Sequence, residues 1–193
     1  MRKLLLIFLF LTNCSLSLLA QQDSGFVNKA EAKNQTVNGL KEGKWIEYMD
    51  IHKSYIKEEK GAEFYCLSIY NGGKANGLQR YYIKTGKLMN TTPMRSGKRD
   101  GVVKEYYESG KLLGTYPYKN DSIEGIVRTY YENGNLRLEA TYSGGKKNGP
   151  FKTYRIDGKL DMVRQYTNDM ISETINHNPN EGDNKPLNSD RKL

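Results

Sequence analysis

The feature that most constrains this chain is a repeat of 24 residues. The segment GVVKEYYESGKLLG at 101–114 returns as GIVRTYYENGNLRL at 125–138. Self-similarity at a fixed period in this range is typical of an array of stacked structural units. Four columns of residues keep the period: Gly77, Gly101, Gly125 and Gly149; Gly86, Gly110, Gly134 and Gly158; Tyr82, Tyr106, Tyr130 and Tyr154; Leu88, Leu112, Leu136 and Leu160.

Each unit is predicted to hold two strands and two tight turns. β-Branched and aromatic residues fill VVKEYY, the residues ESGK supply a turn, and LLGTYPY is again extended in character. Such a short unit has no room for a helix as well. A lone hairpin is marginally stable in water, whereas stacked hairpins share their hydrogen-bond ladders. The predicted fold is all-β, an elongated single-layer antiparallel sheet of consecutive 24-residue β-hairpin repeats.

The repeat array is predicted to occupy residues 34–175. Its first unit, with Trp45 and Tyr48, precedes the next by 34 residues, which indicates an insertion near 49–60. A last unit begins at YTNDMISE and is expected to fail there, because Glu173 stands where the glycine should be; terminal units are often atypical. Residues 21–33 are expected to form a linker and 176–193 a disordered polar tail.

Residues 1–20 have the pattern of a secretory signal peptide. Arg2 and Lys3 precede an apolar run that ends at Ala20. This pattern favours cleavage after Ala20 over lipidation at Cys14, and over a retained transmembrane helix. We therefore expect an exported protein that is periplasmic, secreted or held at the cell envelope. The shortened chain has 28 Lys and Arg against 22 Asp and Glu, and its single Cys66 excludes an internal disulfide.

At this point the units resemble a known family. The recurring glycines, cores such as YYENG, and junctions such as SGGKKNG are similar to MORN repeats. The resemblance is to the variant form found in exported bacterial proteins and in the YwqK-type group labelled antitoxins, and it covers about 140 of 193 residues. It implies β-hairpins stacked into an elongated sheet. The antitoxin label implies neutralisation of a partner protein.

Two columns supply the candidate binding residues. The tyrosines are expected in line on one face at about 9.6 Å spacing. They would grip a peptide, glycan or lipid, or, as the thin sheet favours, form the sheet's own core. The basic column would meet anionic lipid, acidic polysaccharide or acidic protein, or be a solvated face, which its acidic neighbours favour. The candidates are Tyr82, Tyr106, Tyr130 and Tyr154 with Arg80, Lys104, Arg128 and Lys152.

A further apolar column lies three positions before the tyrosines. It consists of Trp45, Val103, Val127 and Phe151. An odd offset in a regular strand places two side chains on opposite faces. Either a bulge lies between the columns, or both faces of the sheet are partly covered.

The chain offers little for catalysis. His52 and His177 lie outside any nucleophile or carboxylate motif, and neither a phosphate-binding loop nor a zinc-type spacing is present. We predict no enzyme activity, no catalytic, metal or cofactor site, and no nucleic-acid partner. The predicted function is a non-enzymatic exported scaffold for a protein partner of unknown identity. The alternatives are binding to an anionic lipid or glycan surface, and an antitoxin-like neutraliser.

Overall fold

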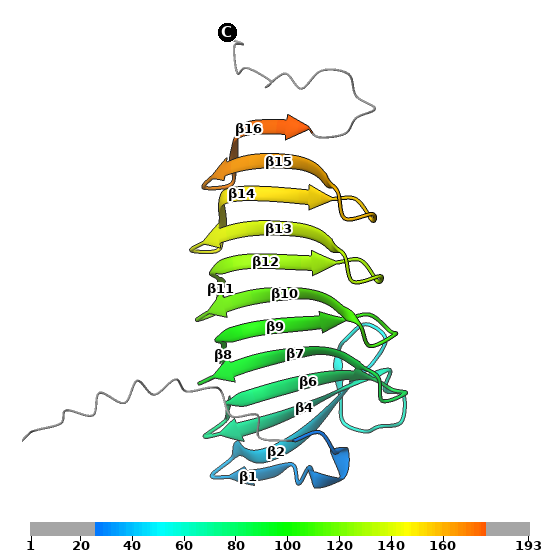
Figure 1. Cartoon of the computed structure of the whole chain (residues 1–193). Coiled ribbons are helices and arrows are strands. Elements are labelled where there is room, and N and C mark those ends of the chain that lie inside the picture. Colours follow the sequence, from blue (N-terminus) through cyan, green and yellow to red (C-terminus); the bar gives the residue numbers. More distant parts are fainter. Residues whose placement is uncertain (1–25, 177–193) are drawn as a thin grey trace, which may run out of the picture.

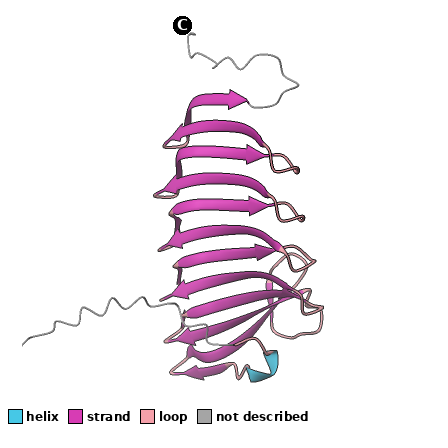
Figure 2. Cartoon of the chain, in the orientation of Figure 1, coloured by secondary structure: helices cyan, strands magenta, loops and turns pink. Residues whose placement is uncertain are grey.

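The computed structural model describes residues 26–176, which form one continuous antiparallel sheet (Figures 1 and 2). Figure 1 shows the strands stacked in a single layer from β1 at one end to β16 at the other. The predicted all-β, elongated hairpin array is therefore confirmed. The predicted signal peptide, residues 21–25 of the predicted linker and residues 177–193 of the predicted tail lie outside the described residues.

The described sheet contains 16 strands, preceded by the 3₁₀ turn η1 (Lys29–Glu31). The first four are β1 (Gln35–Val37), β2 (Leu40–Met49), β3 (Tyr55–Ile56) and β4 (Phe64–Asn71). The next seven are β5 (Lys74–Ala75), β6 (Gly77–Ile83), β7 (Leu88–Arg95), β8 (Lys98–Arg99), β9 (Gly101–Tyr106), β10 (Leu112–Lys119) and β11 (Ser122–Ile123). The last five are β12 (Gly125–Tyr130), β13 (Leu136–Ser143), β14 (Lys146–Tyr154), β15 (Leu160–Thr167) and β16 (Met170–Asn176).

Two-residue turns connect the units on one side of the sheet, at the ends of the strands. Both turn residues have positive φ, between 49° and 83°, as the favoured two-residue hairpin turns require. Glycine, asparagine and aspartate tolerate this backbone region best, which explains the composition of the junctions. The pairs are Asn38-Gly39, Gly72-Gly73, Ser96-Gly97, Asn120-Asp121, Gly144-Gly145 and Asn168-Asp169.

A second kind of turn recurs on the opposite side of the sheet, at the other ends of the strands. Tyr107 donates its backbone N–H to the carbonyl of Lys111 at 2.8 Å, and Gly110 donates to the carbonyl of Tyr107 at 2.8 Å. The same two bonds form in the units that begin this turn at Ile83, Tyr131 and Arg155. Because the backbone pattern repeats with the sequence, each unit aligns its strands with those of the next.

The last unit extends further than expected. Asn168 and Asp169 form the usual turn, and β16 continues through Glu173, which lies opposite Gln165 in β15. The register shifts between Gln165 and Tyr166, as it does beside Gly149 in the pairing of β13 with β14. An antiparallel ladder needs only the turn and an available partner strand, so the expectation that the unit fails at Glu173 was wrong.

The insertion folds against the first strands. Strand β3 pairs with the last two residues of β2, Tyr48 and Met49. Glu59 accepts a hydrogen bond from Tyr48 at 3.5 Å and forms an ion pair with Lys29 of η1 at 2.5 Å. The insertion therefore ties η1 to the first unit.

Side chains alternate between two faces of the sheet. Thr115 lies opposite both Lys104 and Arg128, so the basic column and the tyrosines two positions later share one face, which we call the basic face. Val103 and Val127 lie on the other face and are only 8% and 5% exposed. A register shift also lies between the two columns, at Glu105/Tyr106 of β9 and at Thr129/Tyr130 of β12. In the first case the extra residue belongs to the partner strand β10, so β9 keeps its alternation and both faces are partly covered. Both interpretations are therefore confirmed.

The compact core lies at the N-terminal end of the basic face. Phe26 and Leu67 are 0% exposed and Tyr82 is 9% exposed. The partly buried residues packed around these three are Ala32, Ile46, Tyr65, Ile69 and Leu88. On the other face, side chains such as Cys66 and Ala140 are also buried, at 0% and 1% exposure.

Candidate binding surface

The first member of each predicted column is buried. Arg80 is 4% exposed, and its Nη1 donates a hydrogen bond at 3.0 Å to the backbone carbonyl of Phe26. Tyr82 packs against Phe26 and stacks on Tyr65, with ring centroids 4.9 Å apart. These two candidates thus contact the chain's own N-terminal segment.

The other six candidates continue along the basic face beyond that segment. Lys104 is exposed, whereas Arg128 and Lys152 flank Glu139 at 2.9 and 3.9 Å. Tyr106, Tyr130 and Tyr154 are half-buried. Glu139 lowers the net charge of this row. Surface ion pairs contribute little to stability, so these contacts do not fix the side chains in place. A role of these residues in binding stays a prediction.

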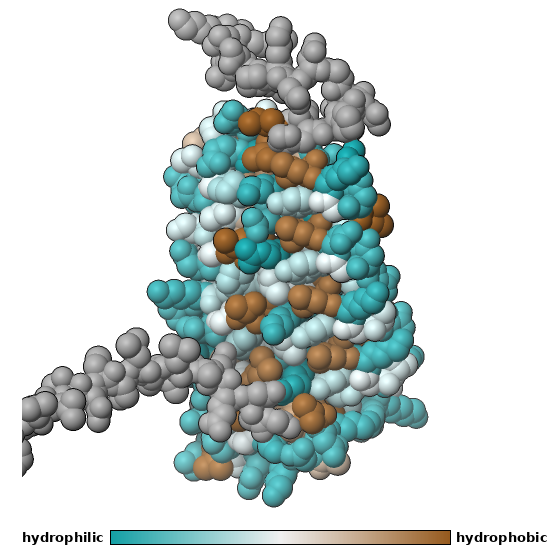
Figure 3. All heavy atoms as spheres, viewed as in Figure 1, coloured by the Kyte–Doolittle hydropathy of each residue, from teal (hydrophilic) through white to brown (hydrophobic). Residues whose placement is uncertain are grey.

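Exposed aliphatic side chains accompany the basic column. Val102 is 44% exposed and Ile126 is 40% exposed, each two positions before a basic residue of the same face. On the face in view in Figure 3, hydrophobic patches recur along the array with hydrophilic side chains between them. A shallow groove of about 350 Å³ is lined by Leu78, Arg80, Thr91, Pro93, Val102, Lys104 and Tyr106.

The opposite face carries a second aromatic column that was not among the candidates. We call this the aromatic face; its column is Tyr70, Tyr118, Tyr142 and Tyr166, with Met94 at the remaining position. The guanidinium carbon of Arg99 lies 4.1 Å from the ring centroid of Tyr118, and Lys147 Nζ lies 5.0 Å from that of Tyr166. Such cation–π contacts hold the turn cations against the rings. In the sequence, the residue that precedes junctions such as SGGKKNG recurs with the 24-residue period, and this recurrence was the signal for the column.

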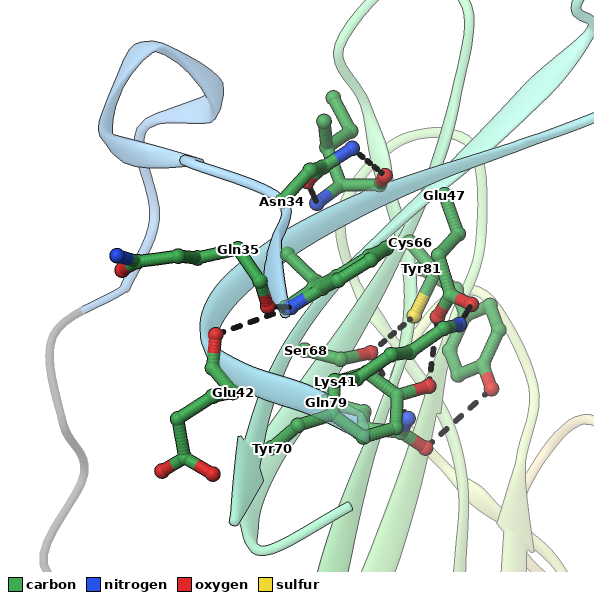
Figure 4. Close-up of polar contacts among 12 residues, drawn as sticks. Asn34, Gln35, Lys41, Glu42, Glu47, Cys66, Ser68, Tyr70, Gln79 and Tyr81 are labelled. Atoms are coloured by element: carbon green, nitrogen blue, oxygen red, sulfur yellow. Dashed lines mark hydrogen bonds and ion pairs between the residues drawn. The ribbon is translucent and has the colours of Figure 1, made fainter. Parts of the chain in front are cut away.

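A polar network occupies the start of the aromatic face (Figure 4). Glu47 forms an ion pair with Lys41 and accepts a hydrogen bond from the Tyr70 hydroxyl at 2.8 Å. Lys41 also lies over the rings of Trp45 and Tyr70, 4.8 Å from each centroid. Burial, followed by the hydrogen bond to Glu47, raises the pKa of Tyr70 well above its usual range. The network holds a charged pair against aromatic rings.

Cys66 belongs to the same part of the sheet. Its Sγ lies 3.2 Å from Ser68 Oγ, and Gln79 Nε2 donates to that oxygen at 2.8 Å. Burial raises the pKa of the Cys66 thiol to about 12, so the thiol stays protonated at neutral pH. A protonated, buried thiol is a poor nucleophile. Cys66 is therefore a small strand residue, as the sequence indicates.

The described residues contain neither a cluster of metal-ligating side chains nor a membrane-crossing helix. Within residues 26–176 no three or more His, Cys, Asp or Glu side chains gather as metal ligands would. Over the same residues, no helix has the length and apolar character needed to cross a bilayer.

The middle of the array matches a known family. Residues 99–120 and 123–143, which are two consecutive units, match the family model of the MORN repeat variant. These two units are MORN repeats of the variant type. A search of curated proteins finds no significant match. The MORN family indicates a binding or scaffold role based on the repeats.

The matched segments share their geometry with the flanking units. The segment 99–120 covers β8, β9 and β10, and 123–143 covers the end of β11 with β12 and β13. The units on either side keep the two-residue turns at Gly72-Gly73 and Asn168-Asp169. The same hairpin geometry therefore extends beyond the residues that the family model matches.

Proposed function

We propose that this MORN array is an exported, non-enzymatic scaffold that binds a protein partner on its basic face. The observation that carries the proposal is the docking of the chain's own N-terminal segment on the first unit. Phe26 fits against Leu67 and Tyr82 with no exposed surface, while Arg80 binds its backbone carbonyl. The basic face thus accommodates a segment of polypeptide that lies outside the repeats.

The next units offer related positions along the same face. Val102, Lys104 and Tyr106 stand one period after Leu78, Arg80 and Tyr82. Thr115, between Lys104 and Arg128, takes the position that Leu67 has in the first unit. These units keep one cation at the position of Arg80 and carry exposed aliphatic side chains, Val102 and Ile126. They favour an extended partner segment with apolar and acidic residues, because charge complementarity adds specificity and speeds association.

The other parts of the proposal rest on the sequence. The basic start and apolar run of residues 1–20 support export to the periplasm, the medium or the cell envelope. The protonated state of Cys66 and the lack of a catalytic motif in the sequence support action by binding alone. The repeats then provide a rigid surface along which one long partner, or several short ones, line up.

A pull-down from envelope extract tests the proposal. The bait is residues 21–193, compared with the double variant Lys104→Glu/Lys152→Glu. The matched control is Lys53→Glu/Lys60→Glu, which reverses two exposed charges of the insertion. We expect the wild type and the control to recover the same protein, and the basic-face variant to recover roughly tenfold less.

Two outcomes would overturn the assignment. One is equal recovery of the protein by both double variants, since the basic face would then play no part. The other is salt-sensitive binding of the purified bait to phosphatidylglycerol vesicles, with loss of that binding in Lys104→Glu/Lys152→Glu and no protein recovered. That result would assign the face to anionic lipid.

A further inference from the structure

A groove of about 470 Å³ lies on the aromatic face, opposite the surface proposed for the protein partner. It runs over β6, β7, β9 and β10 and ends near the turn residue Asp121. Its volume falls in the range of small-ligand sites. Its polar lining includes Gln79, Asn90, Thr92, Glu105 and Tyr116.

The repeat shows that the fold does not require these polar side chains. Forty-eight residues further on, the equivalents of Gln79, Asn90 and Thr92 are apolar. Those equivalents pack in an intact sheet that keeps the same strand pairing. They are Val127, Leu138 and Ala140, of which Val127 is 5% and Ala140 1% exposed. The polar groups of the groove are therefore a departure of one part of the array, and the packing of the repeat does not explain them.

An aromatic ring forms the floor of the groove. A Cβ placed on Gly114 would lie 2.9 Å from the Tyr116 hydroxyl oxygen and 3.0 Å from its Cε2 and Cζ. The Tyr116 ring thus lies along the sheet over the glycine. Burial and a hydrogen bond to Glu105 raise the pKa of Tyr116 to about 12, so the hydroxyl stays protonated. The floor is a flat, neutral ring with a carboxylate beside it.

The walls present neutral donors and acceptors. Gln79 donates to Ser68 at 2.8 Å and accepts from the Tyr81 hydroxyl at 3.4 Å. Asn90 Oδ1 accepts from Thr92 Oγ1 at 3.4 Å. Each side-chain amide has two N–H donors and a carbonyl with two lone pairs, so these contacts leave hydrogen-bonding capacity.

The groove is lined by one cation, Arg99, and two carboxylates, Glu105 and Asp121. Arg99 forms an ion pair with Asp121 at 3.1 Å and lies over the Tyr118 ring. An anion such as a phosphate prefers an unpaired guanidinium, so the groove does not favour one. A sugar ring matches better, because its C–H face packs on an aromatic ring while its hydroxyls bond to amides and carboxylates.

We propose that this groove binds one or two sugar residues of a neutral oligosaccharide. The C–H face of the sugar packs on Tyr116. Glu105, which lies between Asn90 and the Tyr116 ring, bonds to its hydroxyls together with Asn90 and Gln79 on the strands beyond. The site is independent of the basic face, so the glycan and the protein partner bind to opposite sides of the same sheet.

Binding is tested with residues 21–193, the same protein as in the pull-down. Immobilised oligosaccharides of glucose, galactose, mannose and N-acetylglucosamine are screened to find the glycan that binds. Calorimetry with that glycan then measures Kd. The variants are Tyr116→Ala and Asn90→Leu, each of which introduces a residue that a later unit already carries at the equivalent position. We expect both to weaken binding by roughly tenfold or more.

Two controls separate this site from other effects. Tyr142→Ala changes a ring of the aromatic face outside the groove, and Lys104→Glu/Lys152→Glu changes only the basic face; neither should alter Kd. Thermal melting checks that all variants fold. The inference is overturned if no glycan binds up to about 10 mM, a very weak Kd. It is also overturned if Tyr142→Ala weakens binding as much as Asn90→Leu.

Discussion

The side-chain amide of Asn34 forms hydrogen bonds with both backbone groups of Ile46. Its Oδ1 accepts from the Ile46 N–H at 2.8 Å, and its Nδ2 donates to the Ile46 carbonyl at 3.0 Å. Asn34 thus takes the place of a strand residue on the outer edge of β2. Backbone pairing with β1 and β3 occupies both ends of that edge, so the outer edge of β2 is covered and the three-residue strand β1 ends the sheet.

Asn34→Ala should open this edge. Two hydrogen bonds to the backbone of Ile46 are lost, and we expect a loss of about 1–3 kcal/mol in the free energy of unfolding. Urea denaturation measures it, with exposed Asn148→Ala as the control. The exposed strand edge should also make the variant associate with rising concentration in light scattering. Unchanged stability would show that water replaces the amide without cost.

Gly149→Ala should cost more than Gly134→Ala. Both glycines have positive φ, 123° and 92°, which an alanine adopts at a cost of about 1–2 kcal/mol. A Cβ at Gly149 would also lie 3.1 Å from Thr141 Cβ, whereas a Cβ at Gly134 would meet no atom within 4 Å. Denaturation of the two variants side by side measures the difference. Equal losses would mean that β13 yields to the new methyl group.

Phe26→Ala should release the N-terminal segment. The side chain is fully buried, so truncation should cost up to about 3–5 kcal/mol, less if the segment detaches while the sheet stays folded. Hydrogen exchange of the Glu31 and Ala32 amides, which bond within η1, reports the release. Val27→Ala, at a position that is 59% exposed, is the control. Retained protection of those amides would contradict the docking.

Stability should fall at alkaline pH because of Cys66. Burial raises its pKa from the ordinary value of 9.0 to about 12 in the folded chain. The unfolded chain therefore loses this proton first as the pH rises. The stabilisation is complete below pH 9 and is lost between pH 9 and 12, with a limiting slope of about 1.4 kcal/mol per pH unit.

Cys66→Ala isolates that contribution, since Tyr116 and other groups titrate in the same range. Urea denaturation at pH 8 and pH 10 gives the loss of stability for each protein. The wild type should lose about 1 kcal/mol more than the variant. Equal losses in both would show that the thiol ionises alike in the folded and unfolded chains.

The repeat geometry was predictable because it is local. The two-residue turns need residues that tolerate positive φ, and pairs such as Gly144-Gly145 mark them in the sequence. The alternation of faces follows from strand parity, which places Lys104 and Tyr106 together. Tyr118 and Tyr166 kept the same period but stood in junctions, so their shared face and their cations became apparent only in the folded sheet.

The sequence by itself determined the unit, its turns and the direction in which the units stack, because all three depend on residues close together along the chain. Tertiary structure decided which positions are covered. Phe26 lies 54 residues before Arg80 and buries it, and Asn34 closes an edge from outside the ladder. Contacts of this kind depend on the three-dimensional path of a segment without a repeat, and no period in the sequence encodes that path.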